Sequence, residues 1–180
     1  MNDDDLMVRT ARGDGEAFRL LVERWEKAVF AFHERMVGSA EDALDLSQET
    51  FLRVYDQARK YRPSGQFRSW LFRIAGNLAR SWLRRKRIVR WLRFEPERHD
   101  RSSSSIPADR LLEMDETERA VRQALARLPD RQRQAILLRR YDNLSHQEIA
   151  TALRTTVPAV ESLLQRAMGA LRKDLSRRGL

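Results

Sequence analysis

Residues 67–89 carry two separate stripes of side chains, and each stripe repeats every three to four residues. The first is apolar and consists of Phe67, Leu71, Ile74 and Leu78. The second is polar and mostly cationic and consists of Arg73, Asn77, Arg80, Arg84 and Arg87. Positions three and four apart share one face of an α-helix, whereas a strand brings alternate residues together. The segment is therefore predicted to be a long helix that packs through one face and displays cations on another.

The same helical spacing runs through most of the chain. It predicts a helix over residues 14–36 and, after the break at Gly38-Ser39, another over residues 40–58. The second of these is expected to carry an apolar stripe of Leu44, Phe51 and Tyr55. Further helical patterns cover residues 111–128 and 131–141. Only 7 Gly and 5 Pro occur in 180 residues, too few for a turn-rich β fold, so the predicted fold class is all-α.

The helical pattern is interrupted once over a long stretch. From residue 92 to residue 109 the periodicity disappears, and Ser102–Ser105 lie between two prolines, Pro96 and Pro107. Such a composition favours a flexible linker, although an ordered surface loop is the alternative. We therefore expect two small helical domains, residues 1–91 and 111–180, joined by a flexible linker over residues 92–110.

The distribution of charge points to a polyanionic partner. Lys and Arg number 35 against 26 Asp and Glu, a net charge of +9, and no acidic residue occurs from Gln57 to Phe94. The same stretch contains seven aromatic residues, including Tyr61, Trp70 and Trp82. Cations release counterions from phosphates and flat rings stack on bases, so the pattern favours a nucleic-acid surface. The alternative is a solvated basic helix whose aromatic side chains belong to the core.

Several function classes lack support in the sequence. There is no Cys, and His33, His99 and His146 lie far apart, so neither a disulfide nor a metal site is expected. There is no Gly-rich phosphate loop and no nucleophile motif, so we expect no cofactor and no enzyme activity. No apolar run approaches the ~20 residues of a membrane span. The chain begins Met1-Asn2-Asp3-Asp4-Asp5, acidic where a signal peptide is basic, so a cytoplasmic location without membrane insertion is expected.

Near the C-terminal end the sequence predicts a helix-turn-helix. Ser145 and Glu148 have the spacing of a capping box at the start of a short helix that ends near Leu153. A longer helix begins near Val157 and extends past Leu171, with Pro158 in its first turn, where no helical N–H bond is lost. The apolar residues expected to join the two helices are Ile149, Ala150, Leu153, Val160 and Leu164. In such a motif the second helix enters the DNA major groove.

Three segments resemble one protein family. Residues 42–55 (DALDLSQETFLRVY) and 67–77 (FRSWLFRIAGN) are similar to the polymerase-binding segment and the following segment of bacterial sigma factors of the extracytoplasmic-function (ECF) group, in the sigma-70 family. Leu128-Pro129, Arg133 and residues 143–150 (NLSHQEIA) resemble the C-terminal domain of that group. The resemblance covers roughly residues 14–90 and 115–175, with the motifs in the family's order.

The resemblance implies partners and the residues that contact them. Bacterial core RNA polymerase would be contacted at the β′ clamp coiled coil and at the β flap. The surface for the β′ clamp coiled coil consists of Asp42, Asp45, Gln48 and Glu49. A second would recognise and melt the −10 promoter element, and it consists of Tyr61, Arg62, Ser64, Trp70, Arg73, Asn77, Arg80, Arg84, Arg85 and Arg87. Tyr61 and Asn77 occupy positions that help form a pocket for a flipped base in related factors. An anti-sigma factor is the expected inhibitor.

The helix-turn-helix would read the −35 element in duplex DNA. The residues implied are Arg154, Thr155, Thr156, Pro158, Ala159, Glu161, Ser162, Gln165 and Arg166. Arg154 replaces a Gly that is usual in the turn, so this turn needs another backbone conformation or strain. Glu161, Leu163 and Met168 stand where basic residues are common, so we expect an unusual or weakly held −35 sequence.

Two other classes of function fit part of these observations. A stand-alone helix-turn-helix repressor or activator would bind duplex DNA without polymerase and would need a dimer for paired half-sites. A helical adaptor would use its basic stretch to dock on an acidic protein, and its binding to DNA would not show strong salt dependence.

Overall fold

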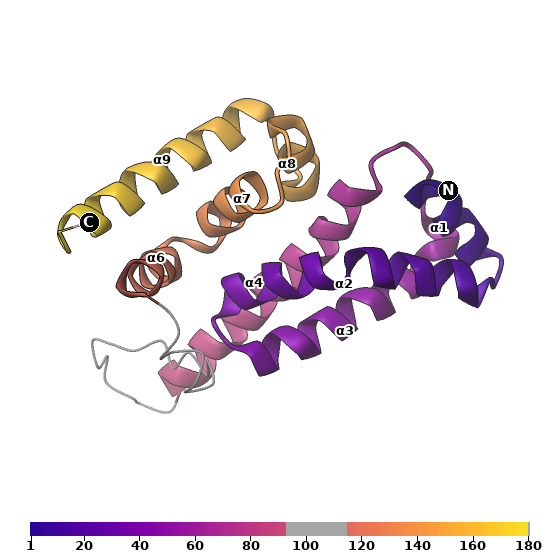
Figure 1. The fold of residues 1–180 in the computed structure, drawn as a ribbon, viewed down its shortest axis with the longest axis horizontal. Coiled ribbons are helices and arrows are strands. Elements are labelled where there is room, and N and C mark those ends of the chain that lie inside the picture. The colour runs from indigo at the N-terminus through magenta and orange to yellow at the C-terminus, as the bar shows by residue number, and fades with distance from the viewer. Residues whose placement is uncertain (93–114, 180) are drawn as a thin grey trace.

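The computed structural model describes residues 1–92 and 115–179, and all regular structure in these residues is helical (Figure 1). The N-terminal helices are α1 (Asp3–Ala11), α2 (Gly15–Val37), α3 (Ala40–Asp56), the 3₁₀ turn η1 (Ala58–Lys60) and α4 (Phe67–Leu92). The C-terminal helices are α6 (Glu116–Arg127), α7 (Asp130–Arg140), α8 (His146–Leu153) and α9 (Val157–Ser176). The all-α prediction is confirmed. The predicted linker, apart from its first residue, and residues 111–114 lie outside the described residues.

The helix ends follow local capping chemistry. Ser39 begins α3, and its side chain accepts a hydrogen bond from the Asp42 amide at 3.2 Å. Ser145 and Glu148 form the predicted reciprocal capping box at the start of α8. Helix α1 was not predicted, although Asn2 and Asp5 form a capping box of the same kind at its start. An Asn or Asp three positions before an acidic residue is the pattern of such a box, and it could have indicated the start of this helix.

The N-terminal helices enclose a core of their own. Phe67, Leu71 and Ile74 of α4 are buried in it, as their spacing predicts. The stripe predicted for α3 is wrong in part, because Leu44 and Tyr55 are 52% and 49% exposed. Helix α3 instead packs through Leu46, Phe51, Val54 and smaller side chains, which leaves Leu44 and Tyr55 facing solvent.

A second core joins the N-terminal and C-terminal helices. Phe72, Ala75 and Ala79 of α4 belong to one buried cluster with residues of α7 and α8, including Leu137 and Ile149. Helix α4 therefore buries two faces, whereas its sequence suggests one. Helix α8 packs along α4, and α7 packs against α2 (Figure 1).

Polar contacts reinforce this second core. Arg133 of α7 is buried and donates from Nη1 to the Met36 carbonyl of α2 at 2.6 Å. Arg87 of α4 makes two hydrogen bonds to Asp130, at 3.1 and 2.7 Å. The guanidinium of Arg35 lies 4.1 Å from the centre of the Tyr141 ring. In this closed arrangement the C-terminal helices cover one side of α2 and α4.

Candidate nucleic-acid and polymerase interface

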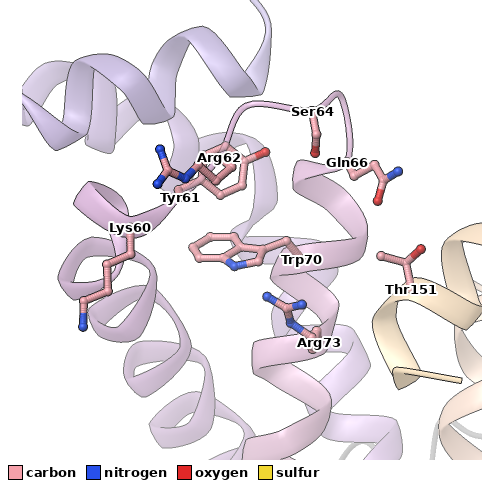
Figure 2. A pocket seen from close by; sticks show the side chains of 8 residues that line it. All are labelled: Lys60, Tyr61, Arg62, Ser64, Gln66, Trp70, Arg73 and Thr151. Carbon is pink, nitrogen blue, oxygen red and sulfur yellow. The ribbon is translucent and has the colours of Figure 1, made fainter.

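The loop of residues 61–66, between η1 and α4, forms one side of a cavity of about 210 Å³ (Figure 2). Its lining comes from the loop, the first turns of α4 and one residue of α8: Lys60, Tyr61, Arg62, Ser64, Gln66, Trp70, Arg73 and Thr151. Five of these belong to the predicted −10 surface, and the fold brings all five together. The lining contains no acidic residue.

Two aromatic rings line this cavity. The Tyr61 and Trp70 rings lie 4.8 Å apart and inclined by 62°, and Phe67 lies 6.0 Å from Tyr61. Phe67 is 3% exposed and so belongs to the core, whereas Trp70 is half-buried and contributes to the cavity wall. Figure 2 shows Trp70 between Tyr61 and Arg73. The cavity therefore offers an aromatic surface beside cations.

Burial affects the cationic wall of the cavity. The pKa of the Arg73 guanidinium is lowered chiefly by burial and further by the nearby Arg154. Arg73 is partly buried, and among the described residues no carboxylate forms an ion pair with it. Such a cation gains from an anionic ligand, because the ligand replaces lost hydration. The cavity thus combines stacking with attraction for a phosphate, which suits a nucleotide.

A second, larger groove of about 830 Å³ lies between α3 and α4. Asp42, Asp45 and Glu49 line it from α3, and α4 contributes cations and Asn77. Arg154, from the turn after α8, completes the lining. Tyr61 and Asn77, which the resemblance places at one base pocket, line different hollows here. Asn77 lines this groove, and its side-chain oxygen accepts a hydrogen bond from Arg80 at 2.6 Å. Arg73 lines both hollows.

The acidic residues of α3 adjoin an exposed apolar strip. Leu44, Leu52 and Tyr55 are each about half exposed or more, and Gln48 lies between them at helical spacing. An apolar strip bordered by carboxylates is typical of a protein-binding surface. The sequence located the carboxylates but assigned Leu44 and Tyr55 to the core.

The four arginines of the predicted −10 surface that lie in the second half of α4 have different surroundings. Arg84 and Arg85 are exposed and line the groove. Arg80 is half-buried, and burial lowers its pKa. Arg87 is bound to Asp130 of α7. Of the four, Arg87 is thus engaged by a C-terminal helix in the closed arrangement.

The turn of the helix-turn-helix keeps the backbone shape that favours glycine. Arg154 has φ 49° and ψ 59°, in the left-handed region. Strain, rather than a different turn, therefore accommodates the replacement of Gly by Arg. Thr156 caps α9 by accepting from the Ala159 amide at 3.3 Å, and Pro158 lies in the first turn as predicted.

The other predicted −35 residues lie along the start of α9. Glu161, Gln165 and Arg166 are exposed, and Thr155, Ala159 and Ser162 are partly buried. The carboxylate of Glu161 lies 3.6 Å from Nδ1 of His146, at the start of α8. His146 is partly exposed in the first turn of its helix, as expected.

Sequence reasoning missed four residues at these surfaces. Lys60 precedes the loop and Gln66 is its last residue, so both were detectable by proximity in the sequence alone. Thr151 lies far away in sequence, and only the packing of α8 on α4 brings it to the cavity. Asp4 contacts the loop from α1, a helix that the sequence did not suggest.

Two kinds of structural feature are absent from the described part of the chain. Within residues 1–92 and 115–179, no helix is both long and apolar enough to cross a bilayer. The same residues contain no cluster of three or more side chains suited to holding a metal ion.

The two groups of helices match two conserved regions of one class of transcription protein. Residues 21–88 match the family described as Sigma-70 region 2, and residues 118–171 match Sigma-70, region 4. The RNA polymerase sigma-H factor of Pseudomonas aeruginosa is 33% identical over 96% of this chain and 93% of its own length. The ECF RNA polymerase sigma factor SigW of Bacillus subtilis is 32% identical over 91% of both chains.

Solved structures agree with this assignment. A structure of CnrH in complex with the cytosolic domain of CnrY superimposes with a TM-score of 0.74 at 28% identity, covering 97% of each chain. The sigma factor RpoE of Bartonella quintana, in complex with the anti-sigma factor NepR, has the same fold, with a TM-score of 0.68 at 20% identity over 88% of this chain and 96% of that one. The chain belongs to the ECF sigma factors of the sigma-70 family. It is a DNA-binding transcription initiation factor and not an enzyme, as the sequence predicted.

Proposed function

We propose that this sigma factor binds bacterial core RNA polymerase in the cytoplasm, recognises the −35 and −10 promoter elements and promotes opening of the DNA. The cavity beside Tyr61 and Trp70 carries the proposal. Its volume of about 210 Å³ is below the roughly 300–1,000 Å³ of a pocket for a drug-sized ligand, which suits a single base. The cations around it attract the phosphates on either side of such a base.

The energetics of base capture fit this cavity. Flipping one base out of a duplex costs a few kcal/mol, and stacking on aromatic side chains returns ~1–3 kcal/mol per base. Phosphate contacts from Arg84 and Arg85 would add affinity without reading sequence. The −10 element would thus be held as a single strand along α4, with one base in the cavity.

The polymerase contact would use α3. Asp42, Asp45, Gln48 and Glu49 offer polar and charged groups, and the exposed Leu44 and Leu52 add apolar area beside them. Charge-assisted hydrogen bonds from the carboxylates would fix the alignment of the partner on this surface, and apolar contact would supply affinity. We propose that this surface binds the clamp coiled coil of β′ and that the C-terminal helices contact the β flap.

The start of α9 would read the −35 element as duplex DNA. Exposed Gln165 and Arg166 are suited to the edges of bases and to phosphates in the major groove. Arg154 and Thr156 lie at the N-terminal end of α9, where a helix-turn-helix approaches DNA most closely. Glu161 would oppose phosphate there, which is why we propose a weakly held −35 element.

The closed arrangement would have to open for promoter binding. The −35 and −10 elements lie about 25 base pairs apart, roughly 85 Å along B-DNA at ~3.4 Å per base pair. In the closed arrangement Thr151 of α8 lines the cavity proposed for the −10 base (Figure 2). Both elements cannot be bound while α8 packs on α4.

We also propose an anti-sigma factor as the inhibitor of this chain. The similar structure of CnrH holds the cytosolic domain of CnrY and matches this chain over 97% of its length. A protein that binds the closed arrangement would stabilise it by mass action and keep the cavity covered.

Run-off transcription with purified bacterial core polymerase on a genomic library tests the proposal. Transcripts with defined starts should appear only when this protein is added, and alignment of their promoters should give the −35 and −10 sequences. A stand-alone regulator would produce no new starts and would instead bind paired half-sites as a dimer. Absence of new starts, with a polymerase active with another sigma factor, would refute the proposal.

A pair of variants tests the polymerase surface. Asp45→Ala should weaken co-migration with core polymerase, because Asp45 is an exposed carboxylate of the acidic surface. Glu26→Ala removes an equally exposed carboxylate from α2 and should leave co-migration unchanged. Equal behaviour of the two variants would place the polymerase contact elsewhere.

A further inference from the structure

One carboxylate of α1 holds the loop that lines the proposed base cavity. Oδ2 of Asp4 accepts a hydrogen bond from the backbone amide of Gly65 at 2.6 Å. Oδ1 of the same side chain accepts a hydrogen bond from the hydroxyl of Tyr61. Tyr61 is the first residue of the loop, and Gly65 lies near its end. Asp4 therefore ties the two ends of the loop to one point.

Asp4 is itself held firmly. Asn2 and Asp5 cap the start of α1 reciprocally. In the next turn of α1, Leu6 and Met7 are fully buried in the N-terminal core. A side chain on a helix anchored in this way keeps its position better than a side chain on a loop, which is what a positioning group requires.

The bond from Tyr61 fixes the orientation of the ring in the cavity. The Tyr61 ring packs against Trp70 on one side, and its hydroxyl reaches Asp4 on the other. Burial, together with the Asp4 carboxylate, raises the pKa of Tyr61 well above its usual value. The phenol thus stays protonated and remains a donor to Asp4 at physiological pH.

The bond from Gly65 fixes the turn of the loop. Gly65 has φ 70°, in the left-handed region that glycine adopts without strain. This conformation presents its amide to Asp4. A charge-assisted bond to the amide would preserve the turn while a DNA strand binds and leaves.

We propose that Asp4 is a positioning residue for base recognition, acting through Tyr61 and the backbone of the loop. The inference rests on the proposed function, in which the cavity takes a promoter base. Asp4 lies outside residues 21–88, the segment that matches Sigma-70 region 2. Helix α1 therefore takes part in base recognition, because Asp4 in its first turn positions the loop.

The main test compares Asp4→Ala with Asp3→Ala. Both remove one carboxylate from the first turn of α1, but Asp3 forms a surface ion pair with Arg24, which contributes little to stability, and within the described residues it makes no hydrogen bond to the loop. Open-complex formation with core polymerase would be measured on a promoter from the run-off experiment, with each of the four bases in turn at every −10 position. Asp4→Ala should lose about tenfold in discrimination at the position that occupies the cavity, and Asp3→Ala should match the wild type.

A second variant tests the bond from Tyr61 without disturbing α1. Tyr61→Phe keeps the ring and removes only the hydroxyl, so it should fold normally and lose part of the same discrimination. The double variant with Asp4→Ala should discriminate no worse than Asp4→Ala alone, because both remove the same bond. Additive losses would show that Tyr61 acts independently of Asp4 and would overturn the proposed route.

Amide hydrogen exchange of Gly65 in the free protein supplies a readout that does not depend on DNA. The amide should be protected in the wild type and in Asp3→Ala, and it should exchange at least tenfold faster in Asp4→Ala. A wild type that opens promoters regardless of the −10 base would refute the proposed function. A wild type that selects a base, with Asp4→Ala selecting it equally well, would refute only the role of Asp4.

Discussion

Gly76 of α4 lies directly against the side chain of Gln134 of α7. A Cβ atom on Gly76 would be 1.9 Å from Nε2 and 2.6 Å from Cδ of Gln134. Gln134 is completely buried, so its amide has little room to move away. The close approach of α4 and α7 in the closed arrangement therefore depends on the absence of a side chain at position 76.

Replacing Gly76 should open the closed arrangement. Gly76→Leu favours the helix but places a bulky side chain against Gln134, and overpacking of this kind costs ~1–3 kcal/mol. We expect a larger radius of gyration by small-angle scattering and tighter binding of single-stranded −10 DNA. Gly169→Leu is the matched control, because nothing lies within 4 Å of a Cβ at Gly169 of α9. If both variants are as compact as the wild type, the contact between Gly76 and Gln134 does not hold the N-terminal and C-terminal helices together.

The strained turn of the helix-turn-helix gives a second prediction. Arg154 has φ 49°, which costs ~1–2 kcal/mol for a residue with a Cβ, and glycine recovers part of this after its own entropy cost. Arg154→Gly should therefore be about 0.5–1 kcal/mol more stable to urea unfolding than Arg154→Ala. Both variants remove the same charge, so the difference between their free energies of unfolding reports the backbone strain at position 154. Equal stability would mean that the turn relaxes when the side chain is shortened.

His33 of α2 should make the stability of the fold sensitive to acid. It is fully buried, and Nε2 lies 2.9 Å from Oγ1 of Thr50. Oγ1 donates its own proton to the Leu46 carbonyl at 2.7 Å, so His33 is the donor to Thr50 and carries its proton on Nε2. Burial lowers the pKa of His33 to about 3. The unfolded chain, with a pKa near 6.5, takes up a proton first as the pH falls.

The free energy of unfolding should consequently fall as the pH decreases from about 6.5 toward 3. Between pH 7 and pH 5 this single group accounts for about 2 kcal/mol. His33→Gln should lack this dependence, and His146→Gln, at a partly exposed position, should retain it. Asp142, whose pKa burial raises to about 6, acts in the opposite direction but is common to all three proteins. Urea unfolding at several pH values measures the difference, and equal slopes for His33→Gln and the wild type would contradict the assignment.

The sequence predicted the parts of this molecule that depend on local pattern. Helix positions, the capping box at Ser145 and the burial of Phe67 all follow from spacing and capping chemistry over a few residues. The second buried face of α4 was not predictable in this way. Phe72 and Ala75 do not belong to the apolar stripe that the spacing shows, and their partners on α2, α7 and α8 lie far away in the sequence.

The same limit explains what was missed at the candidate site. Tyr61, Trp70 and Arg73 are close in sequence, were predicted together and line one cavity. Thr151 and Asp4 reach the cavity and its loop only through tertiary packing, so local spacing carried no signal for either. Leu44 was assigned to the core because hydrophobicity alone cannot separate a buried stripe from a protein-binding surface.

The charge of Glu161 gives a prediction for −35 binding. Glu161 is exposed on α9, and its carboxylate lies 3.6 Å from Nδ1 of His146. This imidazole neutralises the carboxylate only when it is protonated. On the proposed DNA-facing side of the helix the carboxylate would repel phosphate. Glu161→Lys should therefore tighten binding to a −35 duplex and add one phosphate contact, which steepens the dependence of log K on log salt by ~0.9.

Glu161→Gln separates the loss of the negative charge from the gain of a positive charge, which Glu161→Lys combines. It removes the repulsion without adding a cation, so affinity should rise less than in Glu161→Lys and the salt slope should stay near that of the wild type. Fluorescence anisotropy with a labelled −35 duplex, measured at several salt concentrations, distinguishes the three proteins. Unchanged affinity in Glu161→Lys would show that this face of α9 does not approach the DNA backbone, and the proposed orientation of the helix-turn-helix would be wrong.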